Sequence, residues 1–289
     1  MKKIIKLGIL ITLLFSATGC LFKKDDFDGI DIYTSTYTIE YITNQLYGEY
    51  SNIYSIYPDG VNINEYEVTK KKINEFSKAR LFIYNGLSSE KEIAASLINT
   101  NKNLNIIDVS RGLETKHEDS ELWISPANCL MIAQNIKNGL MEYVSNTSIL
   151  ESIDTEYENL KIKISEFDAE LKLIAENATN KTLIVGNNSF SFLSKYGFEV
   201  INISNSDEEA SSTAQGRAKK AFSNKENNYL FILSGTDEAS EEIAAAVKSG
   251  ATIVKINPMV NLTDEERRND VDYITLMKSF IDAIKTEVY

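Results

Sequence analysis

The sequence holds few of the side chains that bind transition metals most tightly. It contains one histidine, His117, and two cysteines, Cys20 and Cys129, in 289 residues. A closed structural zinc site takes about four imidazole or thiolate ligands, so this chain is not expected to build one by itself. A single histidine also leaves little for acid–base catalysis near neutral pH. No nucleophile elbow, phosphate-binding loop or metalloprotease motif occurs in a suitable context, which favours a binding protein over an enzyme.

Basic residues are also fewer than acidic residues. Thirty Lys and Arg against 42 Asp and Glu give a net charge of −12. Such a chain is repelled by phosphate backbones, so nucleic-acid binding is excluded as an expected function. A hydrophobic content of 43% and an aromatic content of 10% are ordinary for a globular protein. The length is enough for two domains with separate cores.

Long apolar runs are absent except at the N-terminus. There a basic start, MKKIIK, precedes LGILITLLFSA, which is too short to span ~30 Å of hydrocarbon and has the length of a secretory signal. Small residues lead into Cys20, as in a bacterial lipobox. We therefore expect a signal peptide over residues 1–19, a lipid on Cys20, a tether over 20–29, and a protein anchored to the outer side of the cell membrane. An ordinary cleaved signal with an incidental cysteine is the alternative.

Strands alternate with helices along the rest of the chain, a rhythm typical of βαβ units and parallel sheets. The predicted fold is α/β, with two βα lobes whose sheets are mainly parallel. Strands are expected at residues 29–35, 50–57, 79–85 and 104–109, and again at 181–186, 198–203, 228–233 and 252–256. Helices are expected at residues 36–46, 69–78, 88–99 and 128–143, and again at 190–196, 210–222, 238–248 and 271–288.

One predicted helix is out of scale with the others. Apolar residues recur every three or four positions, or at multiples of that spacing, from Ile149 to Ile174, which predicts a helix over 148–178 that is roughly 45 Å long. It could be a coiled-coil segment or a rigid strut between two lobes. The expected organisation is an N-terminal lobe over 30–145, a linking helix over 146–179 and a C-terminal lobe over 180–289.

Five segments in this order resemble the zinc and manganese family of ABC-importer substrate-binding lipoproteins, whose two lobes are joined by one long helix. They are YPDGVNINEYEVT (57–69), SKARLFIYNGL (77–87), DVSRGL (108–113), DSELWISPANC (119–129) and the tail from INPMVNLTDEERRNDVDYITLM. The resemblance covers nearly the whole chain after residue 20, and all three prolines fall on matched positions. It implies an extracytoplasmic monomer that delivers a solute to a permease and ATPase; the alternative is a surface lipoprotein for adhesion or assembly, or a binder of a different polar ligand.

The resemblance also places a binding site, and there the chain departs from the family. The family holds its ion with three histidines and a carboxylate or water. Those positions fall here on Asn64, Glu121, Asn187 and Asn257. His117 lies in a stretch that is a variable loop in the family, and Glu65 is adjacent to Asn64. The resemblance further implies that the corner around Trp123 packs beneath the site.

Three interpretations of these replacements stay open. The site is degenerate and holds no transition metal tightly, because amide oxygens are weak zinc ligands. Alternatively, Asn64, Glu121, Asn187 and Asn257, with Glu65 or His117 nearby, form an oxygen-rich pocket for another divalent cation or a polar organic ligand. In the third interpretation the true ligands lie a few residues away. No cofactor is indicated beyond a divalent metal ion, which in the family is zinc or manganese.

Overall fold

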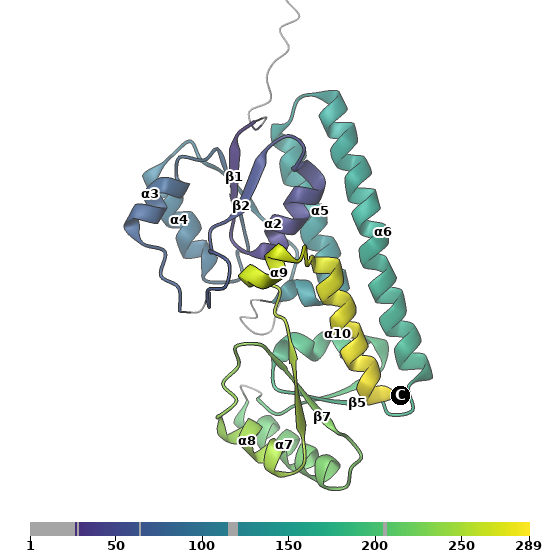
Figure 1. Cartoon of the computed structure of the whole chain (residues 1–289). Helices are drawn as coiled ribbons and strands as arrows, with labels where there is room; N and C mark the ends of the chain where they lie inside the picture. Colours follow the sequence, from purple (N-terminus) through teal and green to yellow (C-terminus); the bar gives the residue numbers. More distant parts are fainter. Residues whose placement is uncertain (1–26, 28, 64, 115–120, 205–206) are drawn as a thin grey trace, which may run out of the picture.

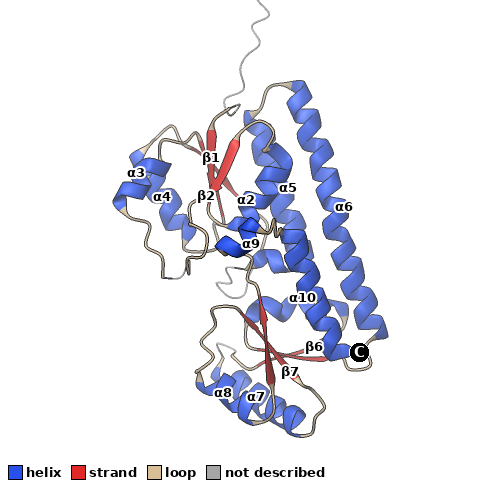
Figure 2. Ribbon diagram, viewed as in Figure 1, coloured by secondary structure: helices blue, strands red, loops and turns tan. Residues whose placement is uncertain are grey.

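The protein consists of two α/β lobes with a long helix running beside both, as its computed structural model shows (Figure 1 and Figure 2). The structure describes residues 27, 29–63, 65–114, 121–204 and 207–289. The predicted fold class is confirmed: each lobe holds a four-stranded sheet whose neighbouring strands are all parallel.

The N-terminal lobe has the strand order β2-β1-β3-β4. The strands are β1 (Asp31–Thr34), β2 (Asn52–Ser55), β3 (Leu81–Tyr84) and β4 (Asn105–Asp108), and the helices are α2 (Tyr37–Tyr47), α3 (Lys70–Phe76), α4 (Glu90–Thr100) and α5 (Pro126–Tyr143). A 3-10 turn, η1 (Leu122–Ile124), precedes α5, which begins with proline at its first position. Proline suits that position because its missing N–H would have no helical partner there.

The C-terminal lobe repeats the arrangement, with the strand order β6-β5-β7-β8. Its elements are β5 (Thr182–Val185), η2 (Asn188–Tyr196), β6 (Glu199–Asn202), α7 (Glu208–Ser223), β7 (Tyr229–Leu233), α8 (Glu241–Lys248), β8 (Thr252–Ile256), α9 (Asp264–Arg268) and α10 (Tyr273–Val288). In both lobes the first strand is an inner strand of the sheet. The second strand pairs with one of its edges and the third strand with the other. Crevices at the carboxyl ends of such strands are where ligands bind in open α/β sheets.

The helix expected over residues 190–196 is present with 3-10 geometry. Residues 188–196 form the 3-10 helix η2. Asn187 caps it, with its side-chain oxygen accepting a hydrogen bond from the Ser189 N–H, and Gly197 ends it at φ 100°. Asn and Ser side chains compete for backbone groups, and this segment holds five of them from Asn187 to Ser194, which explains why a regular α-helix does not form.

The long helix α6 (Thr147–Asn177) has 31 residues and follows the predicted apolar stripe. Its buried side chains run from Ile149 to Ala175 and belong to one hydrophobic cluster that also contains core residues of both sheets. α6 packs against α2 and α5 of the first lobe and against α10 of the second. The helix is therefore a strut that shares its core with both lobes.

The chain returns to the N-terminal lobe after β8. The Tyr37 N–H donates to the Val260 carbonyl at 2.9 Å, and the Gly60 N–H donates to the Leu262 carbonyl at 2.7 Å. The Thr38 hydroxyl donates to the Met259 carbonyl at 2.7 Å. The lobes are thus tied by this returning segment as well as by α6, and α9 lies beside the first lobe (Figure 1). The predicted limits of the lobes remain a prediction.

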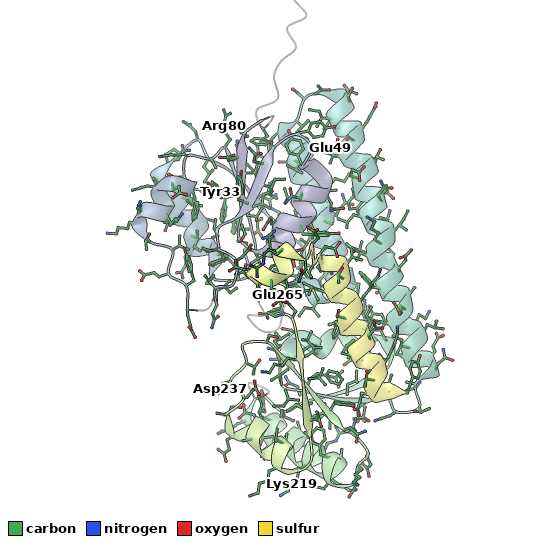
Figure 3. All side chains as sticks on the ribbon, viewed as in Figure 1. Tyr33, Glu49, Arg80, Lys219, Asp237 and Glu265 are labelled. Atoms are coloured by element: carbon green, nitrogen blue, oxygen red, sulfur yellow. The ribbon has the colours of Figure 1, made fainter. Side chains whose placement is uncertain are left out.

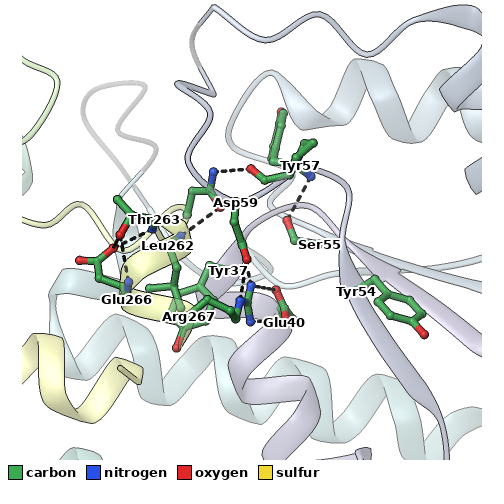
Figure 4. Close-up of polar contacts among 12 residues, drawn as sticks. Tyr37, Glu40, Tyr54, Ser55, Tyr57, Asp59, Leu262, Thr263, Glu266 and Arg267 are labelled. Atoms are coloured by element: carbon green, nitrogen blue, oxygen red, sulfur yellow. Dashed lines mark hydrogen bonds and ion pairs between the residues drawn. The ribbon is translucent and has the colours of Figure 1, made fainter. Parts of the chain in front are cut away.

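An ionic cluster holds the returning segment against the N-terminal lobe. Arg267 of α9 donates to both carboxylate oxygens of Glu40, at 3.0 and 3.3 Å, and to both of Asp59, at 2.9 and 2.8 Å (Figure 4). Burial raises the pKa of the Glu40 carboxyl, and hydrogen bonding and attraction from Arg267 oppose that rise. The Arg267 guanidinium also lies over the Tyr37 ring, 5.4 Å from its centroid.

The surface is polar, as the composition predicts. Glu49, Lys219 and Asp237 are exposed and project from the periphery of the two lobes (Figure 3). Within the part of the chain that the structure describes, no helix combines the length and the apolar character needed to cross a membrane.

Candidate functional site: the interlobe pocket

A pocket of about 510 Å³ lies between the two lobes. We call it the interlobe pocket. The first lobe supplies the loop after β2, from Gly60 to Ile63, and Glu121, which directly precedes η1. The second lobe supplies Asn187 after β5, residues 233–236 at the end of β7, residues 257–258 and 260–263 after β8, and Glu266 of α9. The pocket therefore lies at the carboxyl ends of parallel strands, where such folds bind ligands.

Three of the predicted ligand-binding residues come together here. Glu121, Asn187 and Asn257 all line the interlobe pocket, although they are far apart in the sequence. Asn64 lies outside the described residues, and its neighbours Asn62 and Ile63 line the pocket.

Three further residues were predicted to take part in binding or lipidation: Glu65, His117 and Cys20. Glu65 is exposed and is not among the described residues that line the pocket. His117, proposed as an accessory ligand, and Cys20, the predicted lipidation site, lie outside the described residues.

Asn187 and Asn257 also hold the local backbone. The Asn187 side-chain oxygen accepts from the Ser189 N–H at 2.6 Å. The Asn257 side-chain oxygen accepts from the Met259 N–H at 2.7 Å, which supports Met259 at a φ of 58° in the left-handed region. These amides therefore stabilise the turns after β5 and β8, because an Asn side chain can accept from the backbone N–H two residues further on.

Glu266 is a pocket residue that the sequence reasoning missed. Its carboxylate accepts from the Asn257 amide at 2.8 Å and from the Thr263 N–H at 2.8 Å. The Thr263 hydroxyl accepts in turn from the Glu266 N–H, forming a capping box at the start of α9. The T-x-x-E spacing signals a helix start, but only the fold places that helix at the pocket.

The charge of the pocket is negative. Glu121 and Glu266 contribute carboxylates, and the described lining residues include no lysine or arginine. Among those residues no group of three or more His, Cys, Asp and Glu side chains is arranged to hold a metal ion. The donors that the pocket does offer are carboxylate, amide and hydroxyl oxygens, which suit hard cations and polar solutes better than zinc.

The tryptophan corner fixes the position of Glu121. Trp123 is fully buried, and its indole N–H donates to the Pro258 carbonyl of the other lobe at 2.9 Å. The Tyr273 hydroxyl donates to the Trp123 carbonyl at 2.8 Å. The Glu121 carboxylate accepts from the Ser189 hydroxyl at 3.1 Å, so this carboxylate is held by contacts from the opposite lobe.

A further carboxyl group, that of Glu90 at the start of α4, interacts electrostatically with Glu121. Glu90 is only 3% exposed, and its Oε2 atom has no hydrogen-bond partner. Burial raises the pKa of Glu90 to about 7, and the Glu121 charge adds to that rise. Glu90 is therefore substantially protonated near neutral pH, which limits the negative charge next to the pocket.

We expect Glu90 to make the folded state less stable as pH rises. Its folded pKa of about 7 lies above the ordinary value of 4.5, so its contribution to stability is complete below pH 4.5 and is lost as pH rises through about 7. The loss approaches ~3 kcal/mol, at about 1.4 kcal/mol per pKa unit. Urea unfolding of the Glu90→Gln variant from pH 4 to 8 should lack this part of the pH dependence. The matched control is Glu92→Gln on the same turn of α4, where the side chain is exposed; equal pH profiles for both variants would contradict the assignment.

Comparison with known proteins agrees with the fold. Residues 32–287 match the family model described as zinc-uptake complex component A, periplasmic. The chain is 26% identical to the high-affinity zinc uptake system protein ZnuA of Bacillus subtilis, over 94% of this chain and 93% of that protein. It is 27% identical to the manganese ABC transporter substrate-binding lipoprotein PsaA of Streptococcus pneumoniae, over 68% and 70% of the two chains.

Solved structures show the same fold. The metal-dependent lipoprotein YcdH of Bacillus subtilis superposes with a TM-score of 0.74 at 21% identity, covering 90% of this chain and 99% of that one. The Zn(II)-bound ZnuA-like domain of Streptococcus pneumoniae AdcA gives a TM-score of 0.73 at 20% identity, over 90% and 99%. Family members work with ABC permease and ATPase components. The chain belongs to the ZnuA family, the solute-binding proteins of zinc- and manganese-type ABC uptake systems.

Proposed function

We propose that this protein is a non-enzymatic binding component of a metal-type ABC importer whose interlobe pocket holds zinc only weakly. The observation that carries the proposal is the convergence of Glu121, Asn187 and Asn257 on one pocket between the lobes. The resemblance matches these positions to residues that hold the family's ion, yet none of them is a histidine. The described lining contains no histidine or cysteine.

Weak zinc binding follows from the donors. Zinc prefers imidazole and thiolate at about 2.0–2.3 Å in a four-coordinate site. The described lining offers carboxylates from Glu121 and Glu266 and four asparagine amides. The side-chain oxygens of Asn187, Asn257 and Asn261 already accept backbone N–H groups. A hard divalent cation that keeps part of its water shell, or a polar solute rich in N–H and O–H donors, fits such donors better.

The chain is proposed to act outside the cytoplasm, as a monomer tethered by lipid on Cys20. The names of several relatives include the word lipoprotein. The N-terminal sequence has the basic, apolar and small-residue segments of a lipoprotein signal. A tether of this kind keeps a binding protein close to its permease without a membrane-spanning helix.

Ligand exchange is proposed to proceed by local movement of the pocket loops. α6 packs against both lobes and shares one core with them, and the segment after β8 ties the lobes again. Large hinge closure would break these contacts. The loop from Gly60 to Ile63 forms one edge of the pocket and is a suitable mobile part, because loops open at lower free-energy cost than packed helices.

Titration of the purified chain from residue 21 tests this function. Calorimetry and thermal melts with Zn²⁺, Mn²⁺, Ca²⁺ and small polar solutes are expected to give a zinc Kd weaker than ~1 µM, with at least one other cation or solute raising the melting temperature by mass action. A nanomolar zinc Kd would contradict the weak-zinc proposal. No heat and no melting shift with any of these would instead count against a binding role and favour adhesion or assembly.

A further inference from the structure

A second and larger cavity lies beside the interlobe pocket. Its volume is about 770 Å³, within the ~300–1,000 Å³ range of small-molecule sites. One wall comes from Glu121 and the start of α5, and the other from η2, the end of β6 and the first half of α7. We call it the α5–α7 cleft. Among the described residues, Glu121 alone lines both cavities, so the two are adjacent but distinct.

The two walls of the α5–α7 cleft carry acids. Glu114 and Glu121 belong to the first wall, and Asp207 and Glu209 to the start of α7. Among the described lining residues the single basic one is Arg217. It is ion-paired with Glu199, whose pKa it lowers, and so its charge is already balanced. The cleft therefore favours a cationic ligand.

Two polar side chains at the start of α5, Ser125 and Asn128, line the cleft. Ser125 is only 5% exposed and lines the cleft; it stands at the N-cap of α5, yet its hydroxyl does not cap that helix. Asn128, one turn further, also lines the cleft. Neither side chain hydrogen-bonds to a described residue. A ligand that donates N–H groups can therefore hydrogen-bond to both side-chain oxygens.

Apolar side chains complete the lining. Leu122, Phe192 and Val200 stand among these polar groups, and the Phe192 ring can also take an ammonium group over its face. Carboxylates from two walls, free oxygen acceptors and an apolar surface together match a flexible aliphatic chain with charged ends. We propose that the α5–α7 cleft binds a linear aliphatic di- or polyamine. This second ligand is independent of the solute proposed for the interlobe pocket.

Calorimetric titration of the purified chain with putrescine and spermidine tests the site. We expect saturable one-to-one binding that weakens about tenfold in Glu209→Gln, as expected when one close charge partner is removed. Glu209 is exposed and leaves the capping bond of Asp207 to the Ala210 N–H in place, so the variant should fold normally. Phe192→Leu should weaken binding as well, because it removes the aromatic face while keeping an apolar side chain.

The control separates a built site from general attraction to an acidic protein. Glu241→Gln makes the same change in the first turn of α8, also at an exposed position in the C-terminal lobe, and is expected to bind both amines as the wild type does. Equal losses in Glu209→Gln and Glu241→Gln would overturn the proposal, as would the absence of saturable heat. Neither result would affect the zinc titrations, which report on the other pocket.

Discussion

Replacing Asn64, Glu121 and Asn187 together by histidine is expected to raise zinc affinity by at least ~100-fold, equal to about 2.7 kcal/mol. Glu121 and Asn187 already line one pocket, and the neighbours of Asn64 reach it. Three imidazoles there would supply the ligand type that zinc prefers. Part of the gain will be offset, because Asn187→His removes the cap of η2, which costs about 1 kcal/mol.

Calorimetry with Zn²⁺ measures this gain, and a second triple variant controls for histidine content. Asn103→His, Asn177→His and Asn224→His place three histidines at exposed sites in both lobes and at the end of α6. That variant should bind zinc no better than the wild type. Equal gains in both triple variants, or none in the first, would mean that the three family positions do not converge in a usable geometry.

Removing the Arg267 side chain is expected to destabilise the protein by ~2 kcal/mol. Arg267→Met leaves Glu40 without its charge partner, and the Glu40 side chain is only 10% exposed. Breaking a fully buried ion pair costs about 3–5 kcal/mol, and the smaller figure applies because the Arg267 side chain is 39% exposed and partly screened. For a chain of this length the melting temperature should fall by about 5 °C.

Two further variants distinguish the ionic cluster from a general effect of losing arginine. Arg217→Met removes an ion pair in which both side chains are more than half exposed, so it should cost less than about 0.5 kcal/mol. Adding Glu40→Gln to Arg267→Met should restore part of the lost stability, because the unpaired buried charge is then absent. Urea unfolding measures all three; equal losses for the two arginine variants would contradict the role given to Arg267.

Much of the fold was predictable because local patterns and packing agree. The apolar stripe at helical spacing predicted α6 within a few residues. Its members are all buried: Ile149, Ile153, Leu160, Ile164, Phe167, Leu171 and Ile174. Ile162 and Leu173, which lie outside the stripe, are exposed. Segments expected as strands each contain one. The pattern did not specify the 3-10 geometry of η2, which occurs where Asn and Ser side chains, which compete for backbone hydrogen bonds, outnumber strong helix formers.

The site was less accessible to sequence reasoning. Spacing alone does not bring Glu121 near Asn187 or Asn257; the family resemblance supplied that grouping, and the structure places the three at one pocket. Glu266 and the buried Glu90 were missed, because acids are common in this chain and nothing local distinguishes these two. Their roles depend on tertiary contacts, with Asn257 for Glu266 and with the protein interior for Glu90.

The metal content of the wild-type protein, purified without chelators and measured by mass spectrometry of its metals, tests the central claim most directly. The described pocket residues offer no imidazole or thiolate, and we therefore predict well below one zinc ion per chain. The triple-histidine variant at positions 64, 121 and 187, purified in parallel, should approach one. A wild-type protein that retains stoichiometric zinc, lost on Glu121→Ala, would contradict the account.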